Sequence, residues 1–340
     1  MQAWKISGVH TWLTALILLA VTTPVHAVGQ PVRALHFAVF KLTVFDAKRL
    51  IDNASKEKFN TVILGMPWRN GLNLNSTPWV VPDELTWSRD ELLDVVNYAR
   101  QKNMAVIPQL PLLSHQDLLL APDFPSLMFN AKTYDPRNER VYQLVLPIID
   151  EIIELLHPKA IHIGHEEVVG WKEKHFELGL LKRGEQILPP DLFLDDVNRL
   201  HAYLKKRNIE TWMWGDMLIE PDEFPTMPDR GDINGTSPGY GSALRRKIPK
   251  DIMICDWHYF DDQSDFPSLA AYRAEGFQVL GATWKQTDTI RNFSYYAAIH
   301  GADGMIATTW WPVQGKEWGV VDRIIRDSGE AFDKDFPDAK

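Results

Sequence analysis

Eight short apolar runs recur along this chain. They fall at residues 34–40, 61–66, 105–110, 160–164, 210–214, 252–257, 278–283 and 305–309. A short apolar run bounded by polar residues is typical of a strand buried on both faces. Eight strands alternating with helices match a (β/α)8 barrel, which usually takes about 250 residues or more. We therefore predict an α/β chain with a single (β/α)8 TIM barrel.

Helical periodicity separates many of these runs. Ser88-Arg89-Asp90-Glu91 is a capping box that opens a helix reaching about residue 102. Further helices are predicted at 46–58, 138–156, 191–206 and 289–300. A doubly wound sheet has the same periodicity, but no Gly-rich phosphate loop follows the first strand, which favours the barrel.

The longer connections follow strands. They cover residues 67–87, 111–135, 166–190 and 220–249 and are rich in Trp and Pro. In a barrel these loops meet at the C-terminal ends of the strands, where active sites lie. We expect the functional site on that face.

Residues 1–27 have the pattern of a signal peptide. Lys5 precedes an apolar stretch at 13–21, and Val25-His26-Ala27 has the small-x-small form of a cleavage site. The apolar stretch is short for a membrane anchor. We expect a secreted or periplasmic domain over residues 28–340, with no membrane association after signal removal.

Charge and cysteine content limit the partners. The formal net charge is −9, and no cluster of Lys and Arg suits phosphate binding, which argues against nucleic acid. Cys255 is the single cysteine, so no intramolecular disulfide can form. It lies in an apolar run and is interpreted as an inert core thiol.

Two adjacent carboxylates follow the fourth apolar run. Glu166 and Glu167 come directly after Ile161-His162-Ile163-Gly164-His165. Where a strand ends the chain turns, so both side chains can reach one cleft. Sugar-cleaving enzymes use such a pair, with one acid protonated and one carboxylate ionised. A solvated pair on the surface is the competing interpretation of these two residues alone.

Several motifs together resemble the catalytic domain of glycoside hydrolase family 20, the β-N-acetylhexosaminidases. The run from His162 to Glu167 is similar to the family's His-x-Gly-Gly-Asp-Glu signature. Val106-Ile107-Pro108-Gln109 resembles its Ile-Pro-Glu strand, and the segment from Leu110 to His115 resembles its Pro-Gly-His segment. Trp212-Met213-Trp214-Gly215-Asp216 resembles its Trp-rich fifth strand.

The resemblance implies a mechanism for cleaving a terminal β-linked N-acetylhexosamine. Glu167 would be the general acid, which must be protonated near neutral pH, and burial beside another carboxylate favours that state. Glu166 would orient the substrate's 2-acetamido group, which itself attacks the anomeric carbon. His115 and His162 would support the acid and bind substrate. His162 could equally be a hydrogen-bonded core histidine.

Aromatic and polar residues near strand ends complete the predicted carbohydrate site. The chain has 13 Trp, and a flat indole face packs against the C–H face of a sugar ring. We predict that substrate is also bound by Trp214, Trp257, Trp284, Trp310, Asp216, Glu317 and Lys41. The chemistry requires no cofactor, and the spacing of His162, His165, Glu166 and Glu167 matches no zinc motif, so no metal is expected.

The chain departs from the family pattern at several positions. Lys41 stands nearest to the family's sugar-gripping Arg, Gln109 replaces a Glu, and Glu166 replaces an Asp. Lys285 stands where the family often has a Tyr, and the second strand lacks the family's His and Asp. Lys has no bidentate fork with which to grip sugar hydroxyls as Arg does. Together these changes leave the identity of the sugar undetermined.

Two alternatives follow from these departures. In one, the chain is a glycosidase of other specificity, and a protein carboxylate such as Asp216 or Asp256 is the nucleophile or base. In the other, it is an inactive carbohydrate-binding barrel. The retained acid Glu167 argues against the second alternative, because a lectin needs no proton donor.

The signal-peptide interpretation predicts a mature N-terminus close to Val28, because Val25 and Ala27 occupy the small-residue positions before the cut. Mass spectrometry of the protein recovered from an expressing host checks this. Recovery of an intact, membrane-held N-terminus would show that the segment is not a cleaved signal.

Overall fold

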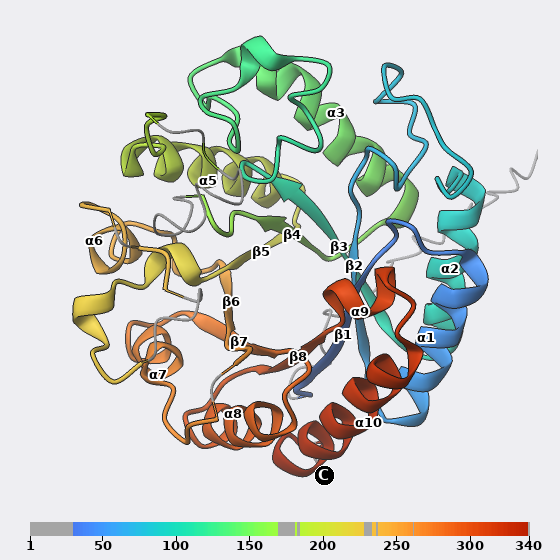
Figure 1. Cartoon of the computed structure of the whole chain (residues 1–340), viewed down its shortest axis with the longest axis vertical. Helices are drawn as coiled ribbons and strands as arrows, with labels where there is room; N and C mark the ends of the chain where they lie inside the picture. The colour runs from blue at the N-terminus through green and yellow to red at the C-terminus, as the bar shows by residue number, and fades with distance from the viewer. Residues whose placement is uncertain are drawn as a thin grey trace, which may run out of the picture.

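A computed structural model describes residues 30–168, 181, 184–227, 233–235, 237–260 and 262–338, and the expected signal segment lies outside them. Eight parallel strands pair in chain order, and β8 returns to β1, so the sheet closes into a barrel (Figure 1). The strands are β1 (Val32–Ala38), β2 (Thr61–Gly65), β3 (Ala105–Leu112), β4 (Ala160–Gly164), β5 (Glu210–Trp214), β6 (Met253–Trp257), β7 (Gln278–Thr283) and β8 (Gly304–Thr308). The predicted (β/α)8 barrel is confirmed.

Helices surround this ring of strands (Figure 1). They are α1 (Val44–Lys56), α2 (Arg89–Gln101), α3 (Glu139–Leu156), α5 (Pro190–Lys205), α6 (Ser242–Arg245), α7 (Pro267–Ala274), α8 (Thr287–Ile299), α9 (Trp310–Gln314) and α10 (Trp318–Asp335). The capping box at Ser88 and Glu91 begins α2 as predicted, and the Thr43 side chain caps α1. Helices α6, α7, α9 and α10 were not among the sequence predictions.

Alternation along each strand divides the apolar residues between two cores. In β1, Ala34 belongs to a cluster inside the barrel, whereas Leu35 belongs to the larger core beneath the helices. Successive strand residues point to opposite faces, and both faces here are covered. The eight strands therefore appear in the sequence as continuous apolar runs.

Glycine is required where the barrel closes. Gly304 pairs with Val32 and has a φ of 145°, and an added Cβ would overlap the Val32 carbonyl oxygen. A side chain here would push β8 away from β1. The closure of the sheet depends on this close approach.

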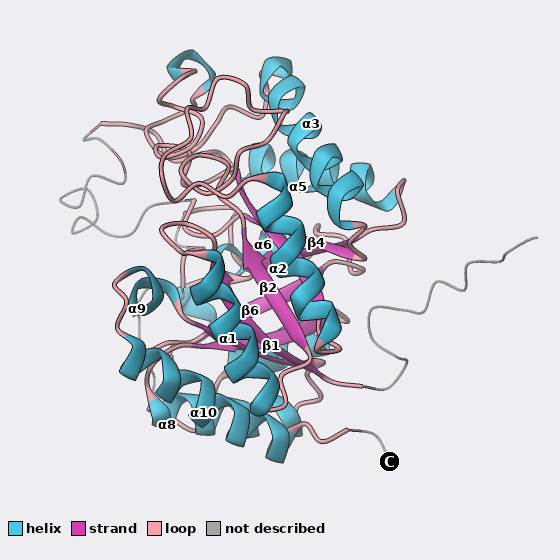
Figure 2. Cartoon of the chain, turned by 90° about the vertical axis from the view of Figure 1, so that its right-hand side faces the viewer, coloured by secondary structure: helices cyan, strands magenta, loops and turns pink. Residues whose placement is uncertain are grey.

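Long loops gather toward one end of the barrel, together with α9 (Figure 2). They follow the C-terminal ends of strands, as the sequence predicted. The expected first strand is displaced by two residues, because β1 ends at Ala38 rather than at Phe40. Among the described residues, no helix is long and apolar enough to cross a membrane.

Candidate active site

The backbone turns sharply at the end of β4. Gly164, His165 and Glu167 have φ values of 76°, 72° and 52°. Residues other than glycine rarely adopt this left-handed region, and they do so at a cost of about 1–2 kcal/mol each. At Gly164 a Cβ would lie 3.1 Å from Glu166 Oε2 and 3.2 Å from Leu112 N. This strained turn is what aims both carboxylates at the barrel mouth.

Asp216 holds the turn from the neighbouring strand. It follows β5 and is 1% exposed, and its Oδ2 accepts a hydrogen bond of 2.8 Å from Glu167 N. The Asn234 side chain donates a second hydrogen bond of 2.8 Å to the same oxygen. The left-handed conformation of Glu167 is therefore fixed by a buried side chain outside its own loop.

His165 anchors the turn on the opposite side. Its Nδ1 lies 2.9 Å from Ile163 O, and its Nε2 lies 2.9 Å from Asp196 Oδ2. Asp196 is fully buried on α5 and also accepts hydrogen bonds from the hydroxyls of Tyr134 and Tyr142. His165 is thus directed into the protein core rather than toward the carboxylate pair.

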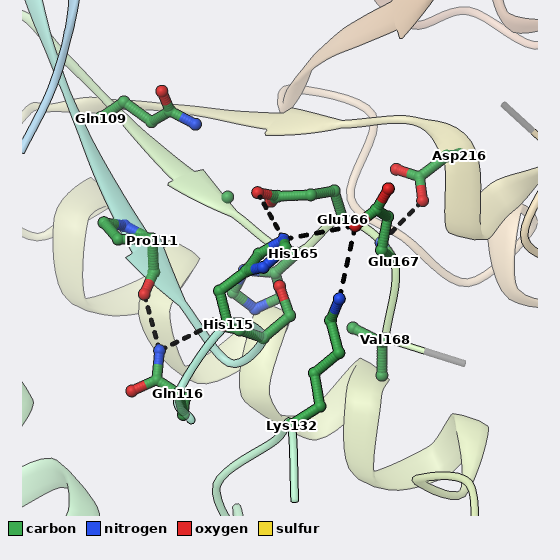
Figure 3. A network of polar contacts seen from close by, with 12 residues as sticks. Gln109, Pro111, His115, Gln116, Lys132, His165, Glu166, Glu167, Val168 and Asp216 are labelled. Atoms are coloured by element: carbon green, nitrogen blue, oxygen red, sulfur yellow. Dashed lines mark hydrogen bonds and ion pairs between the residues drawn. The ribbon is translucent and has the colours of Figure 1, made fainter. Parts of the chain in front are cut away.

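Two basic side chains contact the carboxylate pair (Figure 3). His115 Nε2 lies 3.3 Å from Glu166 Oε1 and 3.5 Å from Glu167 Oε2. Lys132 Nζ lies 3.3 Å from Glu167 Oε2, and its side chain is completely buried. Because one imidazole nitrogen bridges both carboxylates, the pair is held close together.

The contacts between His115 and the two glutamates shift the pKa values of this cluster. Burial raises the pKa of Glu166, but the hydrogen bond and charge of His115 outweigh it and lower the pKa to about 2. For His115, burial and Lys132 lower the pKa, and the carboxylates of Glu166 and Glu167 outweigh them, so that it is raised. Glu166 is therefore ionised at neutral pH.

The carboxyl with a raised pKa is Asp216. Burial is the largest cause, and it raises the pKa to about 7 despite the hydrogen bonds from Glu167 N and Asn234. The charges of Glu167 and Glu166 raise it further. The Asp216 carboxyl, which contacts Glu167 N, therefore titrates near neutral pH.

Neutral polar side chains form the floor of the mouth. Burial lowers the pKa of His36 to about 4 and that of His162 to about 3, so both rings are uncharged at neutral pH. His36 Nε2 makes a short hydrogen bond with Gln109 Oε1. His162 Nδ1 accepts from Gly164 N at 3.1 Å, so its proton lies on Nε2, beneath Trp214.

The cleft above this floor has two lobes. The aromatic lobe has a volume of about 300 Å³ and is lined by His115, Glu166, Glu167, Trp214, Trp257, Tyr259, Phe260 and Trp310. The β1–β3 lobe has a volume of about 310 Å³ and lies at the ends of the first three strands. The lobes share His115, Glu166 and Trp310, whereas Glu167 lines only the aromatic lobe.

Six of the predicted site residues line these lobes: Glu166, Glu167, His115, Trp214, Trp257 and Trp310. Three others lie behind the lining. His162 and Asp216 are buried below it, and Trp284 packs against Tyr259 and Phe260.

Lys41 and Glu317 line neither lobe. Both are exposed, and Lys41 Nζ lies 5.1 Å from the centre of the Phe40 ring. The structure therefore does not bring these two residues into the cleft with the other predicted site residues. For Lys41 the reason is the early end of β1, which leaves the residue in a turn with a φ of 56°.

Sequence reasoning missed Lys132 and His36. Lys132 lies in the long loop after β3, and no local motif distinguishes it from a surface lysine. His36 gives a clearer signal, because it interrupts an apolar strand on the same face as Ala34. A polar residue at that position of a barrel strand indicates the floor of a site.

Asp256 is excluded from the cleft by strand alternation. It is buried, and its Oδ2 accepts a hydrogen bond of 2.8 Å from Ser268 on α7. Its neighbours Cys255 and Trp257 point into the barrel, so Asp256 points toward the helices. Within the described part of the chain, no three His, Cys, Asp or Glu residues are grouped to hold a metal ion.

Fold and site together define a barrel protein with a pair of carboxylates in an aromatic cleft at the C-terminal face. Residues 40–280 match the glycosyl hydrolase family 20 catalytic domain. The chain therefore belongs to glycoside hydrolase family 20, as its motifs suggested. A search of curated proteins found no match.

Solved structures share this fold at low sequence identity. The β-N-acetylhexosaminidase from Bacteroides fragilis has 16% identity and a TM-score of 0.64, with 89% of this chain and 66% of that chain covered. Dispersin B has 17% identity and a TM-score of 0.59, with 90% and 99% covered. An exo-β-N-acetylglucosaminidase from Vibrio harveyi, in complex with N-acetylglucosamine, has 16% identity and a TM-score of 0.62, with 89% and 54% covered. The present chain thus spans about half to two thirds of two of these proteins.

The raised pKa of Asp216 predicts pH-dependent stability. Its carboxyl has a pKa of about 7 when folded against an ordinary value of 3.8, so the native state holds the proton more tightly than the unfolded state. The wild type should therefore lose stability relative to Asp216→Asn as the pH rises from about 4 to about 7, and the difference should level off above that. Urea unfolding of both proteins between pH 4.5 and 8.5 measures it. A difference that does not change with pH would contradict this assignment.

Proposed function

We propose that this chain is an exported β-N-acetylhexosaminidase, which cleaves a terminal β-linked N-acetylhexosamine with retention of configuration. The observation that carries the proposal is the unlike environment of two adjacent carboxylates in the aromatic lobe. Glu166 is 15% exposed and ionised against His115, whereas Glu167 is 25% exposed and lines only the aromatic lobe. A glycosidase needs this division between a charge-stabilising carboxylate and a proton donor.

Glu166 suits the task of orienting a 2-acetamido group. Its Oε1 contacts His115, and its Oε2 is buried without a hydrogen-bond partner among the described residues. A buried unpaired carboxylate oxygen is costly, and an amide N–H of a substrate would satisfy it. As the acetamido oxygen attacks the anomeric carbon, positive charge develops on the nitrogen, and the anionic Glu166 stabilises it.

Glu167 suits the task of donating the proton. Protonation of the glycosidic oxygen needs a carboxylic acid within hydrogen-bonding reach of it, and Glu167 lines the aromatic lobe beside Glu166. Its backbone is held by Asp216, and its side chain is contacted by Lys132 and His115. After the leaving group departs, the same carboxylate would accept a proton from the attacking water.

The indole rings suit a sugar ring. Trp214, Trp257 and Trp310 surround the carboxylates, and Trp310 donates its Nε1 hydrogen to the Tyr259 hydroxyl at 2.9 Å. Stacked aromatic walls bind the C–H face of a pyranose, and they also exclude water from the reacting centre.

The alternative with a separate protein nucleophile has less support. Glu166 and Glu167 are the two carboxylates among the described residues that line the lobes. Asp256 points toward α7, and Asp216 is engaged with Glu167 N below the surface. An inactive binding barrel is the remaining alternative. Hydrolysis of a 2-acetamido glycoside by the purified protein would exclude it.

Export remains a proposal that rests on the N-terminal sequence alone. Residues 1–27 have the composition of a signal peptide. A hydrolase for extracellular or periplasmic glycans would need such a signal.

We predict that Glu167→Gln lowers kcat roughly 10²–10⁴-fold on a chromogenic β-N-acetylhexosaminide, because the amide cannot donate a carboxylic proton. The loss should shrink for substrates with better leaving groups, which need less protonation. Steady-state kinetics across a leaving-group series measures both effects. Glu84→Gln, the same change at an exposed position, is the control and should retain full activity.

Equal losses across that series, with unchanged circular dichroism, would remove Glu167 from the acid role.

The substrate-assisted route predicts tight inhibition by a thiazoline, because mimics of high-energy states bind 10²–10⁸-fold more tightly than substrate. No glycosyl-enzyme should accumulate with a 2-fluoro glycoside, and Glu166→Ala should remove most activity on acetamido sugars. Intact-protein mass spectrometry and inhibition kinetics measure these outcomes. A covalent adduct on any carboxylate would defeat this mechanism.

A further inference from the structure

The β1–β3 lobe is as large as the aromatic lobe, yet the cleavage chemistry does not occupy it. It measures about 310 Å³, within the size range of small-molecule sites. It opens off the aromatic lobe at His115, Glu166 and Trp310. A cavity of this size beside a reacting centre is suited to bind part of the substrate.

Position relative to the acid identifies which part of a substrate reaches this lobe. The scissile bond must lie beside Glu167, which lines only the aromatic lobe. The β1–β3 lobe meets the aromatic lobe at Glu166, which is proposed to hold the 2-substituent of the released sugar, and Glu167 does not line it. A group in this lobe therefore belongs to the sugar unit being released, and not to the leaving group.

Most of the surface of this lobe is apolar. The apolar residues that line it include Ala38, Phe40, Met66, Pro67, Leu118 and Leu119. Leu118 is 67% exposed, so apolar surface extends to the outside. Such a surface favours an alkyl group, because each methylene transferred from water contributes about 0.8 kcal/mol.

Small residues keep the inner end of the lobe open. A Cβ on Gly65 would lie 3.0 Å from the Cβ of Ala38 and 3.5 Å from Gln109 Oε1. Both Gly65 and Ala38 line the lobe. A larger side chain at either position would take up the space.

The charged groups near this lobe are engaged elsewhere. Arg69 makes a short ion pair with Asp123, and Glu166 is paired with His115. At the floor, His36 and Gln109 are hydrogen-bonded to each other. Arg69, Asn70 and Gln314 also line the lobe, but apolar groups form most of its surface.

We propose that the β1–β3 lobe binds an apolar acyl chain carried by the sugar that the aromatic lobe holds. The proposal rests on the proposed glycosidase function and narrows its substrate class to acylated amino sugars. The chain lies along Phe40, Leu118 and Leu119. The chain is attached either to the 2-nitrogen or to a ring hydroxyl of the same sugar.

Three series of 4-nitrophenyl or alkyl β-glycosides of glucosamine distinguish these attachments. The first varies the N-acyl group from acetyl to butanoyl and hexanoyl. The second keeps N-acetyl and adds an O-hexanoyl ester to the sugar. The third keeps the sugar constant and lengthens the aglycone from methyl to hexyl. Dissociation constants are also measured by calorimetry with hydrolysis-resistant thioglycosides of each series.

We expect kcat/KM or affinity to rise about 10–200-fold from acetyl to hexanoyl in the first series, or on O-acylation in the second, with little change in the third. Ala38→Leu should reduce the hexanoyl-to-acetyl ratio to about one by filling the lobe. Leu118→Asn, at an exposed position that the fold does not need, should reduce the same ratio at least threefold. Ala202→Leu, the same substitution as the first at an exposed position of α5, should leave the ratio unchanged.

Dependence on the aglycone chain alone, or no dependence in any series, would overturn the proposal. So would a chain preference that survives both Ala38→Leu and Leu118→Asn. Failure of the glycosidase function gives a different result, namely no hydrolysis of the N-acetyl substrate. The thioglycoside affinities then decide on the acyl-chain site by themselves.

Discussion

The site depends on a strained backbone that a neighbouring strand holds in place. Gly164, His165 and Glu167 all have positive φ values, and two of them are not glycines. Left alone, such a turn would relax into ordinary extended or helical conformations. The hydrogen bond from Glu167 N to Asp216 prevents this on one side, and the contact between His165 and Asp196 prevents it on the other. The two adjacent glutamates line the same lobe because Asp216, after β5, and Asp196, on α5, hold the turn that carries them.

The same arrangement brings several carboxyl groups together, and the nearby positive charges contact some of these groups and not others. Three carboxyls, Glu166, Glu167 and Asp216, lie together under limited exposure to solvent. His115 and Lys132 provide the nearby positive charge, and both contact the pair rather than Asp216. The floor histidines cannot help, because burial keeps them neutral. As a result burial raises the pKa of the Asp216 carboxyl to about 7.

The sequence predicted the fold well because barrel strands are buried on both faces and give continuous apolar runs. It also predicted the carboxylate pair, since Glu166 and Glu167 follow a strand directly. Lys41 does not line the cleft, because β1 ends two residues earlier than expected, and strand ends are poorly marked in the sequence. Lys132 and the His165–Asp196 contact could not be predicted, because they join segments far apart in the chain. The alternation of a strand can be read from neighbouring residues in the sequence. The partners of a buried charge come from distant segments and are set by tertiary packing.

The pairing of Val32 with Gly304 also affects how the chain is made. Until β8 emerges from the ribosome, β1 can pair only with β2, and its other edge has no partner. At ~5–20 residues per second, synthesis of the intervening chain takes roughly 15–55 s. During that time the apolar edge Val32–Ala38 offers unpaired backbone groups to any other nascent strand. The last strand to be translated thus ends the period in which this barrel is most exposed to misassembly.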